Sequence, residues 1–103
     1  MSAAEDALAW QLTAVGIPFT REVQFARPRR WRSDFEVECF GTQRLLVEVD
    51  GGAFVNGRHT SGAGFEADCE KLNEAAVRGY RVLRVTPRHV EDGRALKWIE
   101  AAR

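Results

Sequence analysis

The chain has no long hydrophobic run, little cysteine and no excess of charge of either sign. No apolar stretch approaches the roughly 20 residues that a membrane-spanning helix needs, so we expect no association with a membrane. The first residues lack the basic segment and the long apolar segment of an export signal. These absences lead us to expect a soluble protein of the cytoplasm.

Cysteine is limited to Cys39 and Cys69, which lie far apart in the sequence. Neither belongs to a Cys-x-x-Cys pair or to a Cys/His spacing that is typical of zinc sites. In a reducing compartment, both are expected to be small core residues. The sequence therefore argues against a zinc centre.

The formal net charge is zero, with 15 Lys and Arg against 15 Asp and Glu. Bulk attraction alone would therefore not hold a nucleic acid. The basic residues are nevertheless concentrated around Trp31, at Arg27, Arg29, Arg30 and Arg32. Arginine beside an aromatic ring suits phosphate contacts and stacking on a base. The alternative is a solvated strand start with Trp31 packed in the core.

The length of 103 residues indicates a single domain, 1–103, near the small end of the usual range. Hydrophobic periodicity and turn signals divide it into elements. In chain order, they are a helix over 3–15, strands over 19–25, 32–40 and 45–49, a helix over 65–79, a strand over 80–85 and a short helix around 96–102. Because a small domain buries little surface, dimerisation would stabilise it, and a homodimer is a further expectation.

The helix between the third and fourth strands requires a crossover, which makes that pair parallel within an otherwise antiparallel meander. The first strand is a candidate edge strand, and the uniformly apolar third strand is a candidate central one. The predicted fold class is α/β, with a mixed four-stranded sheet flanked by helices in the order α-β-β-β-α-β-α.

Carboxylates interrupt two of the predicted core strands near the ends that would meet. Asp34 lies in the second strand, and Glu48 and Asp50 lie at the end of the third. A three-residue hairpin loop would place Asp34 opposite Asp50 and Glu36 opposite Glu48. Like charges facing each other across strands are destabilising unless they are compensated. A divalent cation is the simplest compensation, since Mg²⁺ takes carboxylate and carbonyl oxygens.

Several segments together resemble the PD-(D/E)xK nuclease superfamily, and especially small phage-type VRR-nuclease-like and very-short-patch-repair-like endonucleases. They are the first helix and the segments RWRSDF (30–35), VEVDGG (47–52), GRHTSGAGFE (57–66) and GYRVLRV (79–85). The resemblance implies a restriction-endonuclease-like core. It also implies an endonuclease that hydrolyses DNA phosphodiester bonds with Mg²⁺ or Mn²⁺ and without an organic cofactor.

The resemblance further implies a set of ligands for the metal ion. Asp34 and Glu48 match acidic residues of the second and third core strands, and the Val49 carbonyl matches a backbone ligand. Glu5 matches an acidic residue of the first helix, with Asp6 as its rival. These residues would hold the ion.

The catalytic base is open, because Asp50 occupies the position of the superfamily's lysine. Asp50 itself, Lys71 on the following helix and His59 in the glycine-rich loop are the candidates. Each also has a simpler interpretation. Asp50 could begin a turn, Lys71 could be a solvated helix residue, and His59 could be an exposed loop residue without a role. Glu66 could be a helix-end residue or a supporting ligand.

DNA in a branched, nicked or duplex form is the expected partner, with Arg29, Arg30, Arg32 and Arg58 as candidate phosphate contacts. No recognition helix or zinc module is evident, so the sequence favours a structure-selective or nicking enzyme over one that reads a long site. The competing hypothesis is a non-catalytic nucleic-acid-binding protein with a degenerate nuclease fold. A hydrolase acting on RNA is a third hypothesis.

Overall fold

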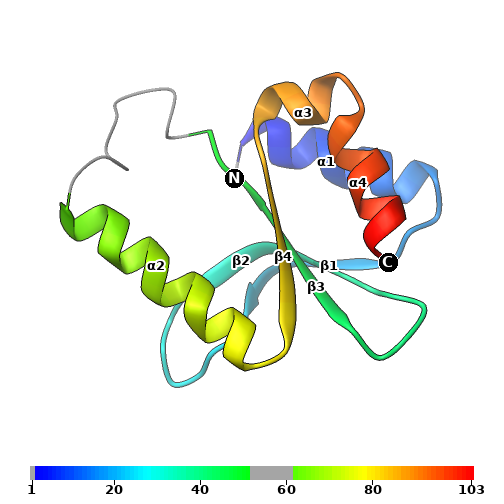
Figure 1. Ribbon diagram of the computed structural model, residues 1–103. Helices are drawn as coiled ribbons and strands as arrows, with labels where there is room; N and C mark the ends of the chain where they lie inside the picture. Colours follow the sequence, from blue (N-terminus) through cyan, green and yellow to red (C-terminus); the bar gives the residue numbers. More distant parts are fainter. Residues whose placement is uncertain (1, 52–61) are drawn as a thin grey trace.

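The computed structural model describes residues 2–51 and 62–103 (Figure 1). Its first half contains helix α1 and an antiparallel meander of three strands. The elements in chain order are α1 (Ala3–Ala14), β1 (Phe19–Gln24), β2 (Arg32–Val37), β3 (Arg44–Val49), α2 (Gly62–Val77), β4 (Tyr80–Val85), α3 (Pro87–Glu91) and α4 (Arg94–Ala102). Within the described ranges, no helix has the length and apolar character needed to cross a membrane.

The four strands form one mixed sheet in the order β1-β2-β3-β4. β1 pairs antiparallel with β2, β2 pairs antiparallel with β3, and β3 pairs parallel with β4. The predicted α/β class, the edge position of β1 and the parallel crossover are thereby confirmed.

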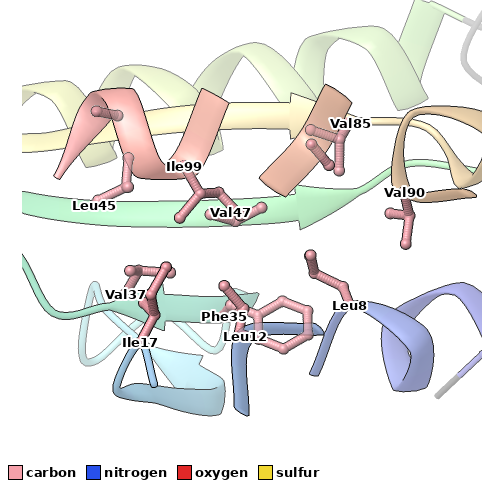
Figure 2. Close-up of a cluster of buried hydrophobic side chains, with 12 residues drawn as sticks. Leu8, Leu12, Ile17, Phe35, Val37, Leu45, Val47, Val85, Val90 and Ile99 are labelled. Atoms are coloured by element: carbon pink, nitrogen blue, oxygen red, sulfur yellow. The ribbon is translucent and has the colours of Figure 1, made fainter. Parts of the chain in front are cut away.

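The helices cover the two faces of the sheet unequally. Helices α1, α3 and α4 lie together on one face, whereas α2 lies by itself on the other (Figure 1). The main hydrophobic cluster fills the space beneath the three helices, where Leu8 and Leu12 of α1 meet Phe35, Val47 and their neighbours (Figure 2). A smaller cluster under α2 includes Leu46 and Ala75. β3 is therefore covered on both faces, as predicted for a central strand.

The β2–β3 register differs from the prediction by two residues. Phe35 pairs with Val47 and Glu36 with Leu46, so the continued ladder places Asp34 opposite Glu48. The assumed three-residue loop was wrong, because the residues after Val37 bond elsewhere. The Glu38 N–H donates to the Pro18 carbonyl, and the Phe40 N–H donates to the Arg103 carbonyl. An even shift keeps the carboxylates on the expected face while changing which of them meet.

The expected apolar stripe of α2 is largely not buried. Of its sixteen residues, Ala75 is the one that is buried, and Phe65 is 63% exposed. The helix packs mainly on β4, and its buried residue is a small one near its C-terminal end. Cys69 of α2 is partly exposed, whereas Cys39 packs at the border of the main cluster, and both thiols are free.

The C-terminal region contains two helices where one was predicted. Thr86 caps α3 reciprocally, since its hydroxyl accepts from the His89 N–H and the His89 Nδ1 accepts from the Thr86 N–H. Gly93, at φ +87°, lies between the helices, and α4 begins at Arg94. A left-handed residue interrupts helical hydrogen bonding, so the chain turns there and α4 takes its own direction.

Candidate active site

The predicted site residues gather at one end of the sheet. β2 runs antiparallel to both β1 and β3. Its first residues therefore lie beside the last residues of β1 and of β3 at this end. The parallel strand β4 ends on the same side. Asp34 of β2 and Glu48 of β3 therefore belong to one region, as the sequence predicts, and the first turn of α1 adds Glu5 to it.

Three carboxylates form what we call the acidic triad, which consists of Glu5, Glu22 and Asp34. Among the described residues, one oxygen from each of these side chains lies within 4.8 Å of the others. Glu5 comes from α1, Glu22 from β1 and Asp34 from β2. Carboxylate oxygens from three separate elements make a donor set that suits a hard divalent cation.

Glu22 is the member of the triad that sequence reasoning missed. The ladder pairs Arg21 with Phe35 and Val23 with Ser33, which places Glu22 level with Asp34 across the hairpin. Glu22 adopts φ +55°, a left-handed conformation that is uncommon for a residue other than glycine. The sequence did carry one signal for Glu22, which is an acidic residue near the end of the strand that precedes Asp34. The long loop between β1 and β2 left the pairing of these two strands undetermined, so the sequence did not show that Glu22 lies level with Asp34.

Burial raises the pKa of Glu5 above its ordinary value, and repulsion from Asp34 and Glu22 raises it further. The Glu5 side chain is only 13% exposed. The guanidinium of Arg21 lies 3.9 Å from the Glu5 carboxylate and is closer to that of Asp6, at 3.1 Å. The structure therefore places Glu5 in the triad, whereas its rival Asp6 is 62% exposed and paired with Arg21.

Asp34 joins the triad to the end of β3. Its Oδ2 accepts a hydrogen bond of 2.8 Å from the Val49 N–H. The contact that the structure records between Val49 and Asp34 therefore uses the Val49 amide, whereas the resemblance implied a role for the Val49 carbonyl. The bond orients the Asp34 carboxylate and leaves its second oxygen for another ligand.

Glu48 of β3 and Asp50, which follows β3, are each paired with a cation from another element. Glu48 Oε2 lies 2.8 Å from Lys71 Nζ of α2, and these side chains are only 18% and 20% exposed. Asp50 pairs with Arg84 of β4. The sequence argument assumed that a metal ion compensates these charges. In the structure, Lys71 and Arg84 supply compensating charge, and Glu48 lies outside the acidic triad.

A cleft of about 520 Å³ opens beside Glu5. It lies between the start of α1, the end of β3 and the start of α3. Its lining consists of Ser2, Ala3, Ala4, Glu5, Val49, Gly51 and Pro87. Gly51 allows a close approach here, since a Cβ at this position would lie 3.3 Å from Pro87 Cγ. Of the triad, Glu5 lines this cleft.

The candidate phosphate-binding arginines differ from one another in their contacts. The guanidinium of Arg29 lies 3.9 Å from the centroid of the Trp31 ring and 3.0 Å from Glu70 of α2. Arg30 and Arg32 are exposed and form no ion pair with any residue that the structure describes. Trp31 is partly buried against the smaller cluster, as the alternative interpretation of this segment held.

Two predicted residues, Arg58 and His59, lie outside the described residues, as does the part of the glycine-rich segment over 52–61. Of the candidate bases that the structure describes, Lys71 contacts the predicted metal ligand Glu48, whereas Asp50 is paired with Arg84. A scan against protein-family models and searches of curated proteins and solved structures found no match to the chain.

Proposed function

We propose that this protein is a metal-dependent endonuclease that hydrolyses phosphodiester bonds of DNA, and that its sheet is a restriction-endonuclease-like core. The observation that carries the proposal is the convergence of the acidic triad and the Glu48–Lys71 pair on one end of the sheet. Carboxylates beside a cation are the groups that phosphodiester hydrolysis with Mg²⁺ or Mn²⁺ requires. A cytoplasmic location and a homodimer are parts of the same proposal.

The acidic triad fits a hard divalent ion. All of its donors are carboxylate oxygens. The pKa of Glu5 is raised by burial first and then by repulsion from Asp34 and Glu22, and a bound cation would relieve that repulsion. Glu5, Glu22 and Asp34 would hold the ion, and Glu48 and the Val49 carbonyl are the further donors that the resemblance implies. When bound, the ion supplies Lewis-acid polarisation of a phosphate oxygen and makes water more acidic.

Lys71 would take the part of the lysine that Asp50 replaces. Its ammonium group is held against Glu48 and is largely shielded from solvent, so its direction is defined. From there, it would offset the negative charge that develops on the phosphate. Asp50 would serve to orient Arg84, with which it is paired.

The loop between β1 and β2 would approach the DNA backbone. It begins just after Glu22 and ends just before Asp34, so it emerges at the same end of the sheet as the triad. Arg30 and Arg32 are exposed at the end of this loop and the start of β2. Phosphate contacts without base readout favour an enzyme that selects DNA structure or introduces nicks.

One observation favours the alternative, a non-catalytic nucleic-acid-binding protein. Glu48 and Asp50 already have protein cations as partners, which is an arrangement that stabilises the fold without any metal. In that case, the loop between β1 and β2 would bind nucleic acid through its arginines. The carboxylates and cations at the end of the sheet would serve only to stabilise the fold.

Incubation with branched, nicked and linear DNA in Mn²⁺ or Mg²⁺ separates the two functions. We expect cleavage that disappears with a chelator and falls at least about 100-fold in Glu48→Gln, which retains a hydrogen-bonding partner for Lys71. Glu74→Gln is the matched control, because Glu74 is paired with Arg78 on α2. DNA binding without cleavage supports the alternative, and absence of both contradicts both proposals. A parallel RNA substrate tests the choice of nucleic acid.

A further inference from the structure

The half of α2 that carries Lys71 is not fixed by hydrophobic packing. Ala75, the buried residue of this helix, lies one turn after Lys71 on the same helical face. The residues of α2 before Lys71 bury no side chain completely. Figure 1 shows α2 apart from the other three helices, so those helices do not hold it in place. The placement of Lys71 must therefore depend on other contacts.

Two consecutive residues of α2 form ion pairs with two different parts of the molecule. Lys71 contacts Glu48 of β3 at 2.8 Å, and Glu70 contacts Arg29 of the β1–β2 loop at 3.0 Å. Because the two partners belong to separate segments, the pairs restrain the helix from two directions. An exposed ion pair adds little to global stability, but it can still select one position of a thinly packed helix.

The guanidinium of Arg29 is oriented by contacts other than Glu70. It lies 3.9 Å from the centroid of the Trp31 ring, and that ring packs against the smaller hydrophobic cluster. The backbone N–H of Arg29 donates to the Ala26 carbonyl at 2.8 Å, and this bond closes a turn that fixes the backbone from which the side chain extends. A planar cation held on an aromatic face loses less freedom when it pairs with a carboxylate.

We propose that Arg29 is a positioning residue, which links Trp31 to Glu70 and thereby holds Lys71 at Glu48. This inference rests on the proposed function for the role of Lys71. It reassigns Arg29 from phosphate contact to support of α2 and leaves Arg30 and Arg32 as the phosphate contacts of this segment. The same contact joins the loop that meets the DNA to the helix that carries the catalytic cation.

Hydrogen exchange tests the positioning role without reference to activity. In Glu70→Gln and in Arg29→Gln, we expect backbone amides over 66–73 to exchange about threefold faster than in the wild type. The double variant should exchange no faster than either single variant, because both remove one interaction. The matched control is the Arg78–Glu74 pair, whose removal by Glu74→Gln should leave these amides unchanged. Equal exchange in wild type and Glu70→Gln overturns the inference.

DNA affinity and turnover distinguish positioning from phosphate contact. If Arg29 contacted phosphate, Arg29→Gln would weaken DNA binding, whereas Glu70→Gln would strengthen it by removing a competing negative charge. Positioning predicts that both variants lower kcat about threefold to tenfold with the dissociation constant for DNA unchanged. Opposite effects on affinity overturn the inference. If the wild type cleaves no nucleic acid, the proposed function fails, and the exchange measurement still decides the positioning role.

Discussion

The acidic triad and the pair of carboxylates at the end of β3, Glu48 and Asp50, lie at the same end of the sheet but differ in how their charge is balanced. Glu48 and Asp50 each contact a cation from a different element. The triad has Arg21 at its margin, 3.9 Å from Glu5, and that arginine is nearer to Asp6. Burial raises the pKa of Glu5, and repulsion between carboxylates raises it further. The triad is therefore the better candidate for a cation site, and the paired Glu48 and Asp50 are the better candidates for fixed charges beside it.

Asp34→Asn should have the largest effect, because it removes the carboxylate that belongs to the triad and also contacts β3. The Asn carbonyl can still accept the Val49 N–H, so the fold should persist. We expect the rate of DNA cleavage to fall by about 1000-fold, with an unchanged circular dichroism spectrum. Cleavage within tenfold of the wild type would contradict the role of the triad.

Lys71→Met should be the most destabilising change among the paired residues. It leaves Glu48 without its cation at a position that is only 18% exposed. We expect the free energy of unfolding in urea to fall by about 2 kcal/mol. The double variant Glu48→Gln/Lys71→Met should recover part of this loss, because the unpaired charge is gone. An additive loss would show that the two residues do not depend on each other.

Mn²⁺ should stabilise the folded protein through the triad. At about ten times its dissociation constant, the ion would add about 1.4 kcal/mol, which corresponds to a rise in Tm of about 7 °C. Glu22→Gln should abolish this rise, whereas Asp92→Asn, in an exposed ion pair with Arg94, should retain it. A rise of equal size in Glu22→Gln would place the ion elsewhere.

Glu5→Gln should have the smallest effect, and the size of the effect depends on pH. The pKa of Glu5 is raised in the folded state, mainly by burial and then by Asp34. Its contribution to stability is therefore present below the pKa of the unfolded state and is lost as pH rises through the folded pKa. Without metal, Glu5→Gln should be more stable than the wild type by about 0.5 kcal/mol near pH 7. The difference should shrink toward about pH 4 in urea titrations, and a difference that grew on acidification would contradict the assignment.

The elements that the sequence predicts correctly are those with a clear local pattern. The helix around Leu8 and Leu12 and the apolar run of β3 appear close to their expected bounds, and the strand around Phe35 begins at Arg32 as expected but ends at Val37, three residues early. The C-terminal region was predicted less well, because α3 and the break at Gly93 that separates it from α4 were missed. Local periodicity and capping depend on neighbouring residues, so a single sequence carries them well.

The candidate site was predicted only in part, because its residues come from separate elements. Asp34, Glu48 and Lys71 were recognised as candidates, but the hairpin register was displaced by two residues and Glu22 was missed. Loop lengths and backbone conformations decide which strand residues lie level, and the left-handed Glu22 is an example. Those features are set by contacts between distant segments.

The sequence by itself determined the α/β class, the order of the strands, the parallel crossover and the presence of acidic residues at the strand ends, because each follows from local patterns and chain connectivity. Only the tertiary structure decided how the carboxylates are grouped. It brought Glu5, Glu22 and Asp34 within 4.8 Å and gave Glu48 and Asp50 their own cations. The physical reason is that charge compensation depends on distances of a few ångströms between elements, and packing and register fix those distances.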